Sequence, residues 1–238
     1  MSEERRPAPF DYDDDVFRHG AEEHALDYSI LQPEFRDVHP LVADRFAAAG
    51  AAPVLDMGCG PTILGSLLDE RGIPWVGLDA AINRLTKGHG PRVLGDAARL
   101  PFADGGFGGV AALYMLYHFE DPLAPIREAH RVLGRGGLFA ACAPSRFDDP
   151  ELATLLPPRS RDTFDSELAP ELLGSLFEIV RVDSWEMAIY RLPTRQVVWN
   201  YLVSRQTPAD VADGVALQVE LPLWLTKRGA TVWGRKPG

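Results

Sequence analysis

Short apolar runs alternate with longer stretches of helical spacing along residues 50–145, and this pattern predicts strands that are followed by helices. The apolar runs, bounded by Gly, Pro or Asp, predict strands at 53–57, 74–78, 92–94, 107–113 and 138–142. The stretches with helical spacing predict helices at 62–70, 81–87 and 123–133. This alternation is typical of an α/β fold, in which helices cover both faces of a doubly wound, mostly parallel sheet.

The two ends of the chain depart from this regular pattern. Residues 21–49 carry apolar positions at helical spacing that Pro33 and Pro40 interrupt, which predicts short helices before the sheet. Beyond residue 145 the pattern predicts three more elements, a helix at 166–176 and strands at 177–182 and 229–234. We therefore expect one α/β core with an addition at its N-terminus and another before its last strand.

The expected organisation divides the chain into four parts. They are an N-terminal acidic segment and helical lid (1–49), the α/β core (50–185), a substrate cap (186–226) and the final strand of the core (227–238). The cap is rich in aromatic residues and arginine, and seven of these are candidates for lining a pocket: Tyr190, Trp199, Tyr201, Trp224, Arg191, Arg195 and Arg205. Packing the cap onto the sheet requires the same apolar residues, so we expect at least half of them in the core.

The composition is that of an ordinary globular protein with an acidic balance. The chain has 238 residues, of which 46% are hydrophobic, and its net charge is −10. This charge argues against nucleic acid or an anionic membrane surface as a partner. Two cysteines, Cys59 and Cys142, are too few for a disulfide framework and lack zinc-site spacing. Because no signal peptide or membrane span is evident either, we expect a soluble, cytoplasmic protein of enzyme size.

Candidate binding residues follow the predicted strands directly, where an open parallel sheet binds its ligands. Gly58 and Gly60 come after the first strand, and the missing side chains there let a ligand approach the backbone closely. Asp79 ends the second strand, where a carboxylate can accept hydrogen bonds from both hydroxyls of a ribose. The third glycine of the dinucleotide fingerprint is replaced by Ile63, which weakens an NAD-binding interpretation.

Six stretches of sequence together carry a family resemblance in their order and spacing. They are 54–60 (VLDMGCG), 75–79 (WVGLD), 95–102 (GDAARLPF), 116–122 (LYHFEDP), 131–138 (RVLGRGGL) and 233–237 (WGRKP). In these stretches the sequence resembles the class I S-adenosylmethionine-dependent methyltransferases. The resemblance is strongest to the small-molecule branch that includes ubiquinone and menaquinone C-methyltransferases. It implies a Rossmann-like sheet of seven strands with the last one antiparallel.

The resemblance also implies a binding site for S-adenosylmethionine. Three groups of residues would hold it: Asp56, Gly58, Cys59 and Gly60 the methionine part, Asp79 and Ala80 the ribose, and Asp96 and Ala97 the adenine. Leu113 and Tyr114 would face the sulfonium. The chain departs from the family at Thr62, where many members carry a third small residue. No metal site is expected.

The predicted function is methyl transfer to an O, N or C atom of a small organic molecule, and several alternatives stay open beside it. His118 is a candidate general base, with a structural role as the alternative, and Tyr114 is a candidate orienting group. An NAD-dependent oxidoreductase or epimerase is a second hypothesis, weakened by the absence of a Tyr-x-x-x-Lys pair. A degenerate cofactor-binding protein without catalysis is a third. The sequence indicates no oligomeric state.

Overall fold

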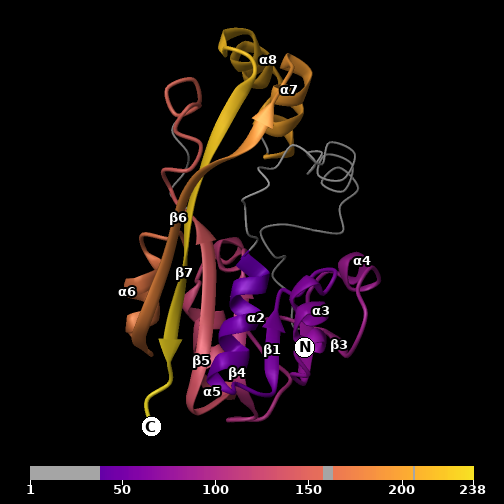
Figure 1. Cartoon of the computed structure of the whole chain (residues 1–238), viewed down its shortest axis with the longest axis vertical. Helices are drawn as coiled ribbons and strands as arrows, with labels where there is room; N and C mark the ends of the chain where they lie inside the picture. The colour runs from indigo at the N-terminus through magenta and orange to yellow at the C-terminus, as the bar shows by residue number, and fades with distance from the viewer. Residues whose placement is uncertain (1–37, 158–162, 206) are drawn as a thin grey trace, which may run out of the picture.

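The computed structural model describes residues 38–157, 163–205 and 207–238, and its centre is a seven-stranded sheet (Figure 1). The strands are β1 (Val54–Met57), β2 (Trp75–Asp79), β3 (Arg92–Leu94), β4 (Phe107–Leu113), β5 (Leu133–Pro144), β6 (Glu178–Leu192) and β7 (Leu223–Arg235). Their order across the sheet is β3-β2-β1-β4-β5-β7-β6. Strands β1 to β5 pair in parallel, whereas β7 is antiparallel to both β5 and β6. The predicted fold class is confirmed, including the antiparallel last strand.

Helices cover both faces of this sheet, as the apolar pattern predicts. The described helices are α2 (Val38–Ala49), α3 (Ile63–Glu70), α4 (Ile82–Leu85), α5 (Leu123–Val132), α6 (Ala169–Gly174), α7 (Arg195–Ser204) and α8 (Ala209–Gln218), with a 3-10 turn at Leu116–His118. Residues of α2 and α3 form one buried cluster against the sheet, and residues of α5 and α6 form another. Side chains alternate between the faces, so that Val54 packs with the first cluster and Leu55 with the second.

Helix α2 differs from the expectation for the N-terminal region. Pro40 does not break it, because a proline in the first turn of a helix removes only an N–H that has no partner inside the helix. The helix also belongs to the core rather than to a lid, since Val42 and Phe46 are fully buried against the sheet. Phe46 contacts the ring of Trp233 edge-on, with 5.6 Å between the ring centroids. The rest of the predicted lid, residues 1–37, lies outside the described residues.

Strands β6 and β7 are much longer than predicted and form a two-stranded ribbon. The ribbon continues past the end of β5, and α7 and α8 lie at its far end (Figure 1). Residues 186–192 and 223–226, expected to be parts of the cap, therefore belong to the two strands. The helical part of the predicted cap is confined to α7, α8 and the short segments around them. The apolar pattern did not predict the full length of the ribbon, because charged residues interrupt it. A ribbon that is partly open to solvent accepts such residues without loss of backbone pairing.

Candidate functional site

The glycine-rich turn after β1 is pinned to the end of β2 by its own backbone. The amides of Gly58 and Cys59 both donate to the carbonyl oxygen of Leu78, at 2.7 and 3.1 Å. The amide of Gly60 donates to Oδ2 of Asp79 at 2.8 Å. The structure therefore brings the predicted turn and the predicted ribose-binding carboxylate into direct contact, 19 positions apart in the sequence.

Two glycines around this turn have a steric reason to lack a side chain. Gly58 has a φ of +70°, and a Cβ added there would lie 2.9 Å from the Cβ of Met115. A Cβ on Gly77 of β2 would lie 2.6 Å from the sulfur of Cys59. Cys59 is thus a small buried side chain that fills space between two strands, and burial raises the pKa of its thiol far above the ordinary range. A thiol in this state is no nucleophile at neutral pH.

The two predicted adenosine-binding carboxylates follow neighbouring strands. Asp79 ends β2 and is half-buried, and its Oδ1 accepts from the amide of Ala81 at 2.9 Å. Asp96 follows β3 and is exposed, and its Oδ1 accepts from the amide of Ala98 at 2.8 Å. Since an ionised carboxylate offers about four acceptor positions, both groups retain capacity for ligand hydroxyl or amino groups.

Asp56 is an acid of the predicted site whose pKa is strongly shifted by its surroundings. Its side chain is only 4% exposed and lies on the face of β1 that packs against α2. Burial raises its pKa to about 7, an effect that His39 of α2 reduces and Asp79 increases. A carboxyl that titrates near neutrality beside a glycine-rich turn is a functional-site signal, because a cationic ligand group would favour its ionised form.

The residues expected near the reacting centre follow β4. Leu113 is buried, and Tyr114 has a φ of 56° while its amide donates to the carbonyl oxygen of Cys142 at 3.0 Å. A tyrosine in this left-handed conformation is uncommon, and such outliers concentrate at functional sites. His118 lies on the following 3-10 turn against the ring of Tyr117, and burial, aided by Arg84, lowers its pKa to about 4.

Two residues that the sequence interpretation missed hold the segment of Asp96 and Ala97. Glu128 of α5 accepts from the amide of Leu100 at 2.7 Å. Arg131, one turn later on the same helix, donates to the carbonyl oxygens of Phe102 and Leu100 at 2.8 and 3.0 Å. The 131–138 stretch of the family resemblance contained Arg131, but nothing in a single sequence connects it to a loop about 30 positions earlier.

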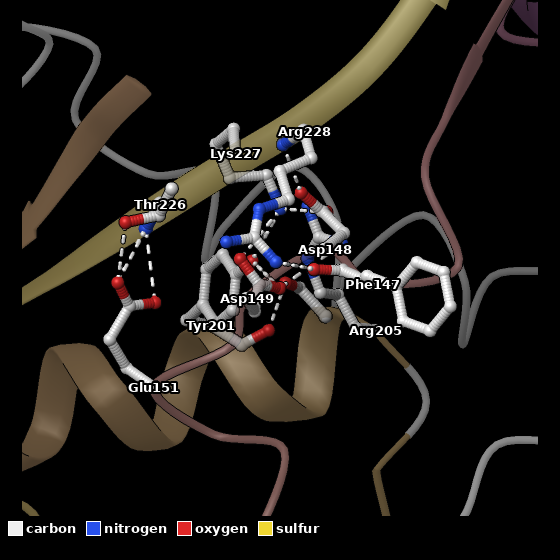
Figure 2. Close-up of polar contacts among 10 residues, drawn as sticks. Phe147, Asp148, Asp149, Glu151, Tyr201, Arg205, Thr226, Lys227 and Arg228 are labelled. Atoms are coloured by element: carbon white, nitrogen blue, oxygen red, sulfur yellow. Dashed lines mark hydrogen bonds and ion pairs between the residues drawn. The ribbon is translucent and has the colours of Figure 1, made fainter. Parts of the chain in front are cut away.

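A buried polar cluster, which we define as Asp148, Asp149, Tyr201 and Lys227, fixes α7 to the ribbon (Figure 2). Lys227 of β7 donates to both aspartates, at 2.7 Å for Asp149, and to the hydroxyl of Tyr201 at 3.1 Å. Tyr201 of α7 also donates to Asp149. Arg205 adds a second cation, 3.8 Å from each aspartate. Lys227 and the exposed Arg205 together balance the charges of the two buried aspartates.

This cluster changes the interpretation of the cap residues. Tyr201 is 1% exposed and belongs to the anchor of the helical pair, and Arg205 packs on its ring at 4.6 Å from the centroid. An open cavity of about 760 Å³ lies between the loop after β5 and the ribbon, lined among others by Ser145, Trp185 and Arg228. None of the seven predicted pocket residues of the cap lines it.

Two kinds of feature are absent from residues 38–157, 163–205 and 207–238. No group of three or more His, Cys, Asp or Glu side chains there is arranged to hold a metal ion. No helix in the same ranges combines the length and apolar character needed to cross a membrane.

Part of the sequence matches known proteins, and the matched family model covers most of the part that forms β1 to β5. The model of a protein family described as a methyltransferase domain matches residues 55–141. A demethylmenaquinone methyltransferase of Mycobacterium sp. strain KMS is 35% identical over 124 residues, which are 47% of this chain and 54% of that protein. The chain therefore spans about half the length of the curated relatives that it matches.

Solved structures with the same fold cover more of the chain at lower identity. The protein BH2331 of Bacillus halodurans C-125 aligns with a TM-score of 0.60 and 20% identity, over 85% of this chain and 100% of that one. The N-methyltransferase NodS of Bradyrhizobium japonicum WM9, solved with S-adenosylhomocysteine, aligns with a TM-score of 0.55 and 13% identity, over 94% and 100%. At these identities the likeness concerns the fold alone.

Proposed function

We propose that this chain is a class I S-adenosylmethionine-dependent methyltransferase that transfers a methyl group to an oxygen, nitrogen or carbon atom of a small organic molecule. The match of residues 55–141 to a methyltransferase domain and the order of the seven strands support the proposal. The observation that carries the proposal is the contact between the glycine-rich turn and Asp79, with 2.8 Å from the amide of Gly60 to Oδ2. This contact joins the ends of two neighbouring parallel strands, which is where an open α/β sheet binds a nucleotide-like ligand. Relatives named demethylmenaquinone methyltransferase support a small organic acceptor.

The residues at these strand ends fit S-adenosylmethionine chemically. In the proposal, Asp79 accepts from the ribose hydroxyls, with Ala80 beside it, and Asp96 accepts from the adenine amino group next to the buried Ala97. The bare backbone of the glycine-rich turn, formed by Gly58, Cys59 and Gly60, lies against the methionine part. Asp56 provides a carboxylate for the ammonium group. Its raised pKa is consistent with this role, because a bound cation would favour the ionised carboxylate.

The chemistry of the proposal needs positioning more than acid–base catalysis. Bound S-adenosylmethionine supplies a methyl group that its sulfonium already activates. The chain contributes orientation and water exclusion, with Leu113 and the strained Tyr114 beside the reacting centre. With a pKa near 4, the imidazole of His118 is neutral at pH 7 and holds a captured proton only weakly. We therefore favour an orienting role for His118 over that of a general base.

The helical pair α7–α8 is the part of the chain that we assign as the substrate cap. It connects β6 to β7 at the far end of the ribbon (Figure 1), and the buried polar cluster ties it to β7 (Figure 2). A cap held by buried ion pairs keeps a defined position relative to the sheet, as selection of one small acceptor requires. The exact boundaries of the cap, and a lid in the N-terminal segment, stay predictions.

Calorimetric titration with S-adenosylmethionine and S-adenosylhomocysteine, with NAD as a control, tests the proposal. We expect both adenosyl ligands to bind and NAD not to bind. Asp79→Ala removes a charged acceptor for two hydroxyls and should weaken binding by about 100-fold, whereas Asp210→Ala on the exposed start of α8 should change nothing. Binding of NAD alone would favour the oxidoreductase hypothesis, and binding of no adenosyl ligand the non-catalytic one.

A further inference from the structure

Thr62, the residue that departs from the family pattern, has an unusual backbone conformation. It follows the glycine-rich turn and Pro61, has a φ of 62° and a ψ of 40°, and is fully buried. Left-handed backbone suits glycine, whereas a β-branched residue adopts it only when its surroundings impose it. Glycine at this position would need no support, but threonine does.

The support comes from a chain of side chains behind the turn. Oγ1 of Thr62 accepts from the amide of His89 at 3.0 Å, lies 3.1 Å from Nδ1 of the same residue, and donates to the carbonyl oxygen of Pro61 at 2.7 Å. Nε2 of His89 lies 3.1 Å from Oδ2 of Asp69, and Oδ1 of Asp69 accepts from the indole of Trp75 at 2.7 Å. The imidazole is thus fixed at both nitrogens.

The segment that carries His89 is also shaped to receive the threonine. A Cβ added to the neighbouring Gly88 would lie 2.8 Å from Cγ2 and 2.9 Å from Oγ1 of Thr62. Because Gly88 has no side chain, the loop before β3 can approach Thr62 closely enough to form these hydrogen bonds. Steric fit and hydrogen bonding therefore point to the same function for residues 88 and 89.

We propose that His89, oriented by Asp69, is a positioning residue that holds Thr62 in the left-handed conformation and so keeps the glycine-rich turn in its cofactor-binding shape. The inference rests on the proposed function, because it concerns the same cofactor site. The affinity of a ligand falls by the fraction of protein that has the competent conformation. Without His89 the turn relaxes toward ordinary backbone angles, and this fraction drops.

Two substitutions of Thr62 separate its backbone from its hydroxyl. Thr62→Val keeps the β-branched shape and loses every hydrogen bond of Oγ1, so that nothing compensates the left-handed strain. Thr62→Gly loses the same hydrogen bonds but adopts positive φ freely. We expect S-adenosylhomocysteine to bind about tenfold or more weakly to the valine variant, and within about threefold of the original protein to the glycine variant.

A double-mutant cycle then tests His89 itself. His89→Ala should weaken binding by about fivefold in the original background, since the backbone hydrogen bond to Thr62 remains, and should have no effect in the Thr62→Gly background. Asp69→Asn should weaken binding in the same direction as His89→Ala. His130→Ala on α5, whose ring packs on Phe177 on the other face of the sheet, is the matched control and should leave binding unchanged.

The outcomes distinguish this inference from the proposed function. Equal weakening by Thr62→Gly and Thr62→Val would mean that the hydroxyl itself matters, and it would overturn the inference while the cofactor site stands. An equal effect of His89→Ala in both backgrounds would do the same. Failure of the original protein to bind S-adenosylhomocysteine would overturn the proposed function and this inference together. Should Thr62→Val not fold, the His89 cycle alone decides.

Discussion

Asp56 allows the electrostatics of the site to be tested without knowledge of the acceptor. Its carboxyl is buried on the α2 side of β1, and burial raises its pKa from 3.8 to about 7. Asp56→Asn replaces the carboxyl with a neutral group of nearly the same shape. The variant therefore removes the titration while it keeps the packing between β1 and α2.

The sign and size of the effect follow from proton linkage. Between about pH 4 and pH 7 the folded protein holds the Asp56 proton and the unfolded chain does not, so the free energy of unfolding falls as the pH rises through this window. A rise in pKa from 3.8 to about 7 corresponds to about 4 kcal/mol in total, of which about 3 kcal/mol falls between pH 5 and pH 8.5. Above this range the contribution is constant.

Urea unfolding of the protein and of Asp56→Asn at about pH 5 and pH 8.5 measures this contribution, because other titrating groups cancel in the comparison. We expect the asparagine variant to gain about 3 kcal/mol over the original protein on going from the lower to the higher pH. Parallel pH dependence of the two proteins would refute the argument that burial controls the ionisation of Asp56.

The same group couples to the cofactor in the proposed function. An ammonium group beside Asp56 favours the carboxylate, so binding near pH 6 should release close to one proton. Titrations in buffers with different ionisation enthalpies count this proton. The expected count is near zero for Asp56→Asn, and equal counts in both proteins would place the ammonium elsewhere.

Three further predictions concern other parts of the molecule. Gly58→Ala should abolish adenosyl-ligand binding in calorimetry while the fold persists by circular dichroism, because φ is +70° and the new methyl would lie 2.9 Å from Met115; retained affinity would contradict this. Lys227→Met leaves two buried aspartates with only the exposed Arg205 at 3.8 Å and should lower the free energy of unfolding by about 3–5 kcal/mol in urea, against little change for Arg135→Met on the exposed surface. Because the pKa of His118 is near 4, the pH profile of kcat/KM should show no inflection from this group between about pH 6 and pH 8. An inflection in this range that is absent in His118→Asn would instead support His118 as the general base.

The parallel half of the sheet could be predicted from the sequence because its signals are local. Each strand is a short apolar run bounded by Gly, Pro or Asp, and the predicted strands 92–94 and 107–113 coincide with β3 and β4. The ribbon of β6 and β7 could not be predicted to its full length. Its residues beyond the predicted strand include charges such as Asp183 and Glu186, and the pairing that satisfies their backbone lies more than 40 positions away.

The residues of the candidate site also fall into two groups, those in contiguous motifs and those held by partners distant in the sequence. The glycine-rich turn and Asp79 belong to contiguous motifs, so the sequence alone was enough to make them candidates. The partners that hold Thr62 and the segment of Asp96 are 27 to 31 positions distant, and the two aspartates that Lys227 contacts are nearly 80 positions from it. A single sequence carries no signal for such pairs, because any exposed His, Arg or Asp has the same local pattern whether or not it meets a partner.

These distant partners explain why the site can be built from loops. The segments proposed to contact the cofactor follow strands and contain few hydrogen bonds of their own, so rigid elements must fix them. Helix α5 holds the segment after β3 through Arg131, and the loop before β3 holds Thr62 through His89. Substitution of such a support should change ligand affinity by altering the population of the competent loop, without removal of any ligand contact. Arg131→Met therefore should weaken adenosyl-ligand binding although Arg131 contacts only protein, and calorimetry that shows unchanged affinity would mean that the loop holds its shape alone.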